Sequence, residues 1–285
     1  MEAKDTLFKK KTTLYCRGKI LSLDLPRVMG ILNVTPDSFF ADSRLQSLDE
    51  VLKRAATMLA DGADILDIGG YSSRPGAADI SVQEELDRVV PAIEAIHAAY
   101  PNAIISIDTF RAQVAEAAVA AGAAIINDIS GGNLDQNMHD TVAKLQVPYI
   151  LMHMRGTPQT MATLAKYEDV VTEVLDELQL KVYSLRQLGI KDIILDPGFG
   201  FAKTIDHNFE LLKRMDELRI LGLPLLAGLS RKSMVYKSLG INQADALTGT
   251  IAVNTIALTK GADILRVHDV KEAKQTIQLY TKALL

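Results

Sequence analysis

Side chains that could bind an anion, or a ligand rich in hydrogen-bonding groups, follow the short apolar runs of this 285-residue sequence. Arginine offers paired donors to phosphate oxygens, and a neutral asparagine oxygen can ligate a Mg²⁺ ion that keeps most of its waters. Aspartate, asparagine and lysine offer hydrogen-bond acceptors and donors on planar or short side chains. The side chains are Asn33, Ser72-Ser73-Arg74, Asp108, Asn127, His153-Met154-Arg155, Asp196, Ser230-Arg231-Lys232, and Arg266 with His268.

The elements that would position these side chains repeat along the chain. The apolar run Val28–Leu32 suits a strand buried on both faces, and it stops at Asn33. Helix-ending glycines lead into later strands at the same step of the repeat. They are Gly62, Gly122, Gly189 and Gly261. We count eight strands with a helix after each, as in a closed (β/α)8 TIM barrel, whose chemistry lies where the strands end.

The domain organisation expected from this repeat is one α/β barrel over residues 26–285. Residues 1–25 would form a short N-terminal hairpin extension that pairs Thr13–Cys16 with Ile20–Leu23. An open doubly wound sheet is the alternative, but a count of eight strands favours closure.

Two helix starts carry capping-box patterns, in which a serine precedes a glutamate by three positions. They are Ser47-Leu48-Asp49-Glu50 and Ser81-Val82-Gln83-Glu84. We therefore expect helices to begin after Ser47 and after Ser81.

Composition excludes several classes of function. A net charge of −4 and a pI near 5.8 give no general attraction to nucleic acid or to an anionic membrane. The single Cys16 excludes an internal disulfide framework and fits a reducing compartment. The first residues do not resemble a signal peptide, and no apolar run is long enough to span a bilayer. We expect a cytoplasmic protein that acts on small molecules.

Each candidate residue also has a purely structural interpretation. Asp108 and Asp128 could cap the helices that follow them, and Asn33 is of a type common in turns. Arg74 could be a solvated loop charge, and His268 could belong to a loop cap. The functional interpretation gains weight because nearly all the predicted strands end in polar groups. Buried carboxylates at a barrel mouth also need partners, which a ligand with N–H donors would supply.

The motifs at these strand ends resemble the signature of the dihydropteroate synthase family. They are Asn33-Val34-Thr35-Pro36-Asp37-Ser38-Phe39, Ser72-Ser73-Arg74-Pro75-Gly76, Ile107-Asp108-Thr109, Asn127-Asp128, Met152-His153-Met154, Asp196-Pro197-Gly198-Phe199-Gly200-Phe201, Ser230-Arg231-Lys232-Ser233 and Arg266-Val267-His268-Asp269. The resemblance implies a (β/α)8 barrel that joins 6-hydroxymethyl-7,8-dihydropterin pyrophosphate to 4-aminobenzoate in folate synthesis, giving 7,8-dihydropteroate and pyrophosphate.

The resemblance also implies a role for each matched residue. The pterin would be held by Asp108, Asn127, Met154, Asp196, Phe201 and Lys232. The pyrophosphate would be held by Asn33, Ser73, Arg74, Arg266 and His268, with Asn33 as the ligand of a Mg²⁺ cofactor. The 4-aminobenzoate, or a sulfonamide that mimics it, would be bordered by Ser73, Pro75, Phe201, Lys232 and Ser233. The catalytic residues would be Asp108, Lys232, Arg266 and His268. A homodimer is implied as well.

We expect a dissociative substitution from these roles. The C–O bond to pyrophosphate would break first, because the pterin ring can delocalise the positive charge, and the arylamine would attack afterwards. Asp108 would stabilise the cation, and Arg266 would stabilise the departing pyrophosphate. Loss of either residue should lower turnover far more than it lowers stability.

Other functions remain as alternatives to the synthase. A methyltetrahydrofolate-corrinoid methyltransferase barrel would have no use for the anion-binding Arg266 and His268. A non-catalytic pterin-binding paralogue could have lost them, and a phosphate-sugar barrel would lack the stretch from Asn33 to Phe39. One departure from the family pattern is Tyr71, where many relatives have glutamate, and it affects loop detail rather than the expected activity.

Overall fold

The computed structural model describes residues 11–34, 44–72 and 79–284. Its main sheet is parallel and runs in the order β8-β7-β6-β5-β4-β3-β10-β9. The strands are β3 (Arg27–Asn33), β4 (Ile65–Gly69), β5 (Ile104–Asp108), β6 (Ile125–Asp128), β7 (Tyr149–Met152), β8 (Ile193–Asp196), β9 (Leu226–Ala227) and β10 (Ile264–Val267). A bridge between Leu195 and Leu225 brings β8 to the β9 edge and closes the barrel.

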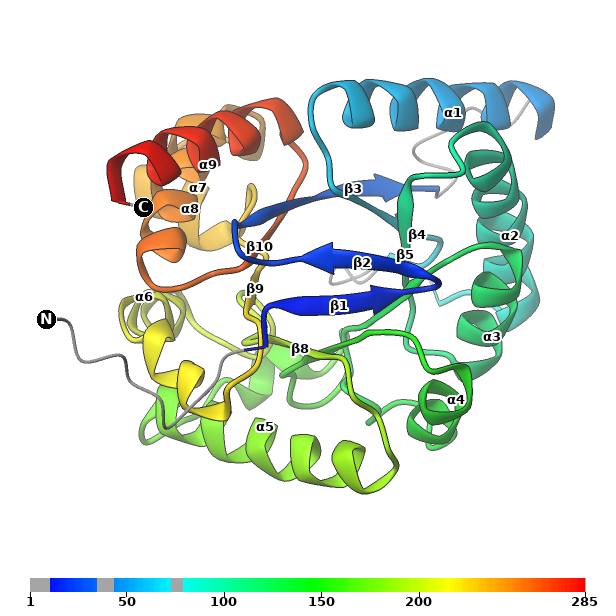
Figure 1. Ribbon diagram of the computed structural model, residues 1–285. Coiled ribbons are helices and arrows are strands. Elements are labelled where there is room, and N and C mark those ends of the chain that lie inside the picture. The colour runs from blue at the N-terminus through cyan, green and yellow to red at the C-terminus, as the bar shows by residue number, and fades with distance from the viewer. Residues whose placement is uncertain (1–10, 35–43, 73–78, 285) are drawn as a thin grey trace, which may run out of the picture.

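Helices surround this barrel in a ring (Figure 1). They are α1 (Arg44–Ala60), α2 (Val82–Ala99), α3 (Ala112–Ala121), α4 (Met138–Leu145), α5 (Val170–Gln187), α6 (Ile205–Lys213), α7 (Ser233–Leu239), α8 (Leu247–Thr259) and α9 (Val270–Leu284). Within the described ranges, no helix is both long and apolar enough to cross a membrane.

Side chains on each strand alternate between the helical ring and the barrel interior. In β5, Ile105 and Ile107 are fully buried in the large cluster that also contains Val89 of α2 and Val114 of α3. Ser106 and Asp108 have the opposite parity and therefore point inward. The same alternation in every strand directs the polar strand-end residues into the barrel.

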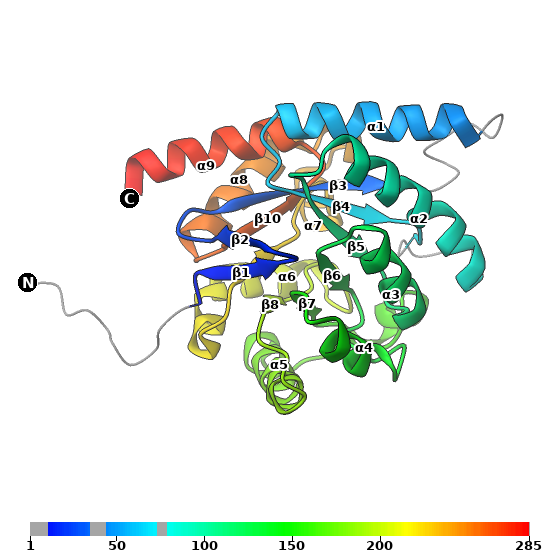
Figure 2. The ribbon, with the colours of Figure 1, turned by 45° about the vertical axis from the view of Figure 1, so that its right-hand side comes forward.

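The N-terminal hairpin closes one end of the barrel. Strands β1 (Thr13–Cys16) and β2 (Lys19–Ser22) pair antiparallel, and Leu14, Cys16 and Leu21 are buried with the first inward side chains of the barrel strands. In Figure 2 the hairpin lies at the end of the barrel where the strands begin. The hairpin does not cover the opposite end, where the strands finish, so a site can form there.

The barrel and the hairpin are confirmed, and the open-sheet alternative is wrong. The second hairpin strand is Lys19–Ser22 and not Ile20–Leu23, because the turn takes only Arg17 and Gly18, so Cys16 pairs with Lys19. Ser81 is the N-cap of α2 as predicted, accepting from the backbone N–H of Glu84 at 3.1 Å. The predicted start after Ser47 is wrong, because α1 already begins at Arg44. An unpredicted short helix, α7, lies between β9 and α8.

Candidate active site at the barrel mouth

Strand register brings three predicted site residues together. Asn33 is level with Gly69, Gly69 with Asp108, and Asp108 with Asn127. Gly69 has no side chain, and a Cβ placed there would lie 3.4 Å from Asn33 Oδ1 and 3.7 Å from Asp108 Oδ2. Asn33 and Asp108 therefore border the same space at the mouth.

Arg266 links this group to a second carboxylate deeper in the barrel. Its Nη2 donates to Asp108 Oδ2 at 2.5 Å, and its Nε donates to Asp67 Oδ2 at 2.6 Å. The same Asp67 oxygen accepts from Asn127 Nδ2 at 3.0 Å. Asp67 is completely buried, whereas Asp108 and Arg266 are each about one-fifth exposed. The cluster therefore runs from the barrel interior to the mouth.

Asp108 is held in an environment that disfavours its charge. Burial raises its pKa to about 7, the Arg266 guanidinium opposes that rise, and the nearby Asp67 carboxylate adds to it. Its oxygen contacts Arg266, so the alternative that Asp108 caps the next helix is wrong: the backbone N–H of Ala112 at the start of α3 is capped by Asp135 at 2.7 Å.

Asp196 and Lys232 form a second polar pair across the mouth. A Cβ on Gly228 would lie 3.7 Å from Lys232 Nζ and 4.0 Å from Asp196 Oδ2. Asp196 Oδ1 accepts from the N–H of Gly198 at 2.7 Å, and Lys232 Nζ donates to the carbonyl of Phe199. Burial lowers the pKa of Lys232 to about 8 and raises that of Asp196. The pair offers one donor and one acceptor to a ligand edge.

An apolar surface lies beside these polar pairs. Met154 is buried at 2% exposure in a small cluster with Met152, and the partly buried Phe201 and Phe110 pack against it. The Lys232 ammonium lies 5.0 Å from the centroid of the Phe201 ring. A planar ring could therefore bind between hydrophobic side chains while Asp196 and Lys232 contact its edge.

His268 is oriented by Ser230. The Ser230 hydroxyl accepts from the backbone N–H of His268 at 3.2 Å and lies 3.0 Å from His268 Nδ1. The two contacts hold the imidazole ring, at the end of β10, in place against Ser230. Ser233 begins α7 immediately after Lys232, which is the N-cap residue of that helix.

Three of the polar residues near strand ends serve the fold and not the mouth. Arg155 turns to α5, where it pairs with Glu173. Arg231 binds Asp269 through two hydrogen bonds of 2.8 Å each. Asp128 accepts from the N–H of Ser130 and from the Tyr149 hydroxyl, both at 2.7 Å. The predicted residues Ser73, Arg74 and Pro75 lie outside the described residues.

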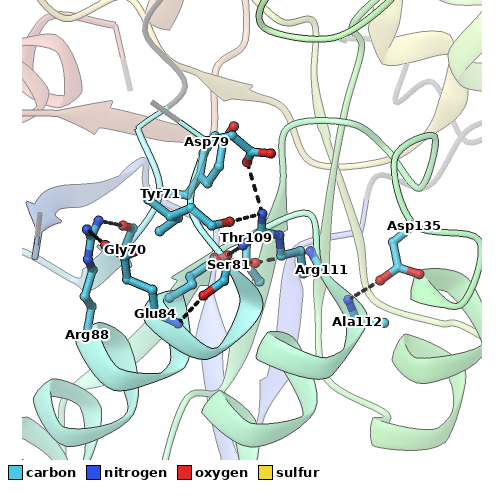
Figure 3. Close-up of polar contacts among 12 residues, drawn as sticks. Gly70, Tyr71, Asp79, Ser81, Glu84, Arg88, Thr109, Arg111, Ala112 and Asp135 are labelled. Atoms are coloured by element: carbon cyan, nitrogen blue, oxygen red, sulfur yellow. Dashed lines mark hydrogen bonds and ion pairs between the residues drawn. The ribbon is translucent and has the colours of Figure 1, made fainter. Parts of the chain in front are cut away.

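The described residues on either side of positions 73–78 are held by a polar network (Figure 3). Arg88 donates to the carbonyl of Gly70 at 2.9 Å. Arg111 donates to Asp79 at 3.3 Å and to the carbonyl of Ile80 at 2.6 Å. The same Arg111 pairs at 3.0 Å with Glu85, which is completely buried and accepts from the Thr109 hydroxyl.

Tyr71, the departure from the family pattern, belongs to this region. Its ring packs edge-on against Phe110 with 5.0 Å between centroids, and the Arg111 guanidinium lies 5.3 Å from the Tyr71 centroid. Tyr71 therefore packs against the segment that follows β5, just beyond Asp108.

Sequence reasoning missed Asp67, although one signal was available. Asp67 is the charged residue within the otherwise apolar strand Ile65–Gly69. A charge inside a buried strand requires a partner, so the sequence signals that Asp67 needs a cationic or N–H donor without showing which residue supplies it.

A closed parallel barrel with a polar mouth is the architecture of the pterin-binding enzymes, and the family model described as "Pterin binding enzyme" matches residues 29–268. The dihydropteroate synthase of Escherichia coli strain K12 is 43% identical over 268 residues, which cover 93% of this chain and 94% of that one. The chain belongs to the dihydropteroate synthase family, whose members are transferases of folate biosynthesis.

Solved structures agree with this assignment. The Yersinia pestis dihydropteroate synthase in complex with a sulfonamide drug is similar at a TM-score of 0.89 and 43% identity, covering 95% of this chain and 98% of that one. The Xanthomonas albilineans enzyme in complex with 7,8-dihydropteroate is similar at a TM-score of 0.86 and 38% identity, covering 96% of this chain and 100% of that one.

Proposed function

We propose that this synthase binds the dihydropterin pyrophosphate and 4-aminobenzoate at the barrel mouth and joins them by dissociative substitution. The observation that carries the proposal is the position of Arg266 against Asp108, with 2.5 Å between Nη2 and Oδ2. Substitution at the pterin CH₂ creates negative charge on pyrophosphate and positive charge on the ring. A cation and a carboxylate side by side can stabilise both charges.

The steps balance without an enzyme nucleophile. The C–O bond breaks and its electron pair leaves with pyrophosphate, so the pterin methylene becomes a delocalised cation. The amine nitrogen of 4-aminobenzoate then forms the C–N bond and loses a proton. Cys16 takes no part, because it is buried at the hairpin end of the barrel, where burial raises its pKa to about 12.

The pterin would lie against the apolar surface of Met154 and Phe201. Asp196 would accept from the ring N–H and amino group, and Lys232 would donate to the carbonyl side. Asn127 and Asp108 would contact the ring from the other wall. The buried Asp196 supports this arrangement, since its raised pKa indicates a carboxylate that gains from a ligand with N–H donors.

The pyrophosphate would be bound by Arg266 and by the imidazole of His268. Ser73 and Arg74 would also bind the pyrophosphate. The 4-aminobenzoate would be bordered by Ser73, Pro75, Phe201, Lys232 and Ser233. Lys232 would thus contact both substrates, which suits its position beside the Phe201 ring.

The donor set fits a Mg²⁺ ion that arrives with the substrate. The described residues contain no group of three or more histidine, cysteine, aspartate or glutamate side chains that could hold a metal ion. Asn33 offers one neutral oxygen beside Asp108, as suits an ion that keeps several waters and binds phosphate oxygens. Asn33 would hold the ion, which when bound would neutralise charge on the pyrophosphate.

We propose a homodimer formed through α7 and α8. Helix α8 contains no charged residue. Leu239 of α7, Ile241 between the two helices and Ile256 of α8 are 56%, 37% and 44% exposed. Exposed apolar side chains beside an uncharged helix suit a second copy of the chain better than a charged partner. Sedimentation analysis should show a dimer for the wild-type chain and a monomer for Ile256→Glu. A monomeric wild-type chain would contradict the proposal.

The domain organisation and location are parts of the same proposal. Residues 26–285 would act as the pterin-binding domain, with residues 1–25 as its extension, and the burial of Leu14 and Leu21 against the barrel supports their joint folding. A cytoplasmic location is supported by the buried, unpaired Cys16.

The deciding experiment measures pyrophosphate release from the dihydropterin pyrophosphate with Mg²⁺, with and without 4-aminobenzoate. Release matched by dihydropteroate formation is expected. Exchange of an isotopic label between the bridging and non-bridging oxygens of bound substrate, without 4-aminobenzoate, would reveal C–O cleavage before attack. Binding without release would instead indicate a non-catalytic pterin-binding protein.

A further inference from the structure

Asp67 has no direct role in the proposed chemistry, yet it contacts two residues that do. Its side chain is completely buried inside the barrel. It is level with Ile31 on β3 and with Ser106 on β5, one inward layer below Asn33 and Asp108. A carboxylate at this depth is costly unless it is paired, so its partners determine what it does.

A single oxygen of Asp67 accepts both of its hydrogen bonds. Oδ2 receives Nε of Arg266 from β10 at 2.6 Å and Nδ2 of Asn127 from β6 at 3.0 Å. These two strands lie on opposite sides of β4 in the sheet order. One atom therefore joins the residue proposed for pyrophosphate to a residue proposed for the pterin.

The consequence for Arg266 concerns the plane of its guanidinium. Two donors on the same planar group, Nε and Nη2, are fixed by Asp67 and Asp108. Two fixed points on a planar fork determine its orientation, which determines where its other N–H groups point.

The consequence for Asn127 concerns which end of its amide meets the ligand. An asparagine amide can bind in two flipped orientations, one presenting oxygen and the other presenting nitrogen. Because Nδ2 donates to Asp67, Oδ1 is the atom left to accept from a ligand. A reversed amide would set two oxygens against each other.

We propose that Asp67 is a positioning residue for the synthase reaction: one buried carboxylate oxygen orients the Arg266 guanidinium for pyrophosphate and the Asn127 amide for the pterin. The inference rests on the proposed function of these two residues. It predicts that one substitution, remote from the substrates, weakens the binding of two chemically unrelated ligands.

The test is Asp67→Asn, which keeps the shape of the side chain and removes its charge. Calorimetry measures the binding of pyrophosphate with Mg²⁺ and, separately, of 6-hydroxymethyl-7,8-dihydropterin without pyrophosphate. Each hydrogen bond to a charged group contributes enough that we expect both affinities to fall about tenfold or more. A purely structural counter-charge would lower thermal stability and leave both affinities within about twofold of wild type, which would overturn the proposal.

Ser106→Ala is the matched control. Ser106 is the register neighbour of Asp67, is equally buried, and its hydroxyl has no hydrogen-bond partner among the described residues. Removing it disturbs the same layer without changing either oriented group. Both ligands should bind this variant within about twofold of the wild-type affinity, and a loss like that of Asp67→Asn would overturn the proposal.

A measurement on the unchanged chain covers the case in which Asp67→Asn does not fold. The Arg266 Nε–H should give a slowly exchanging NMR signal that persists when pyrophosphate with Mg²⁺ is added, because a positioning residue keeps its contact in the complex. Loss of the signal on binding would show that Asp67 releases Arg266, and would overturn the proposal. Failure of the wild-type chain to bind either ligand would instead refute the proposed function.

Discussion

Lys203 donates a hydrogen bond to His153 Nδ1 over 2.9 Å, joining the loop after β8 to the end of β7. The same ammonium donates to the carbonyls of Gly198 and Phe201, each at 3.1 Å. His153 is only 2% exposed, and its Nε2 lies 3.0 Å from Oε2 of Glu177 on α5. One buried lysine therefore fixes the loop that carries Phe201.

Replacing Lys203 with methionine should separate loop order from global stability. Burial lowers the pKa of Lys203 from 10.5 to about 7, so keeping this amine in the fold costs about 4 kcal/mol near neutral pH. Losing three hydrogen bonds costs about 3 kcal/mol, at about 1 kcal/mol each. Because the two terms nearly cancel, we expect the unfolding free energy to change by less than about 2 kcal/mol.

The kinetic effect of Lys203→Met should be larger, with kcat/KM falling roughly tenfold as Phe201 loses its support. Steady-state assays of dihydropteroate formation measure it. Lys213→Met is the control, because Lys213 is 74% exposed and makes one ion pair, a long one of 3.6 Å between its Nζ and Oε2 of Glu210, among the described residues. That variant should keep wild-type kinetics, and equal losses in both variants would contradict the role of Lys203.

His153 should make the fold sensitive to acid. Burial lowers its pKa from 6.5 to about 4, so between these values the unfolded chain binds a proton that the folded chain does not. Unfolding free energy therefore rises with pH in this window, and about 2 kcal/mol is lost as pH falls from about 6.5 to about 4.5. Urea denaturation of wild type and His153→Asn, which keeps an acceptor near Nδ1 but does not titrate, should show a shallower pH dependence in the variant. Parallel curves would refute this origin of the slope.

Asp108→Asn should lower kcat about a hundredfold or more, because the amide cannot stabilise a developing cation as a carboxylate does. With its pKa raised to about 7, Asp108 gains its charge as pH rises through neutrality, so wild-type kcat/KM should increase over that range. The rise should be absent in the variant. Asp135→Asn, a substitution of the residue that caps α3, should leave both the rate and its pH profile unchanged.

Much of this site could be predicted because barrel topology fixes where a strand end must lie. Asn33, Asp108 and Asn127 each follow a local apolar run, and the parallel register then makes them neighbours. Asp67 could not be placed in the same way. Its partner Arg266 is 199 residues distant in sequence, and the pairing is a property of the closed barrel and not of any local pattern.

The same distinction explains other differences. The interaction of Lys203 with His153 spans 50 residues and depends on how one loop folds over a strand end. Ser47 lies in a good capping pattern, yet tertiary context starts α1 at Arg44. Local chemistry predicts which elements exist, whereas long-range packing decides their ends and their buried partners.

Arg266 should be needed for stability as well as for turnover, contrary to the expectation from sequence. Arg266→Met leaves Asp67 and Asp108 without their cation, and breaking a buried ion pair costs about 3 to 5 kcal/mol. Arg266→Lys keeps the charge but loses the planar fork, so it should lose less stability while pyrophosphate release still falls. Urea denaturation separates the two variants. A methionine variant as stable as wild type would show that the two carboxylates find other partners.

Two glycines with similar backbone angles should respond differently to alanine. Gly198 and Gly189 have φ values of 71° and 81°. A Cβ on Gly198 would lie 2.0 Å from the carbonyl oxygen of His153, whereas nothing lies within 4 Å of one on Gly189. Gly189→Ala should therefore cost only the left-handed strain of about 1 to 2 kcal/mol and retain full activity.

Gly198→Ala adds a collision with backbone to that strain, so it should cost at least about 2 kcal/mol more. It should also reduce activity, because the N–H of Gly198 donates to Asp196 and the loop can relieve the collision only by moving away from β7. Thermal unfolding and synthase assays on both variants measure the difference. Equal losses in the two would mean that the loop after β8 yields without disturbing Asp196, and that its close approach to His153 is not what aligns the pterin wall.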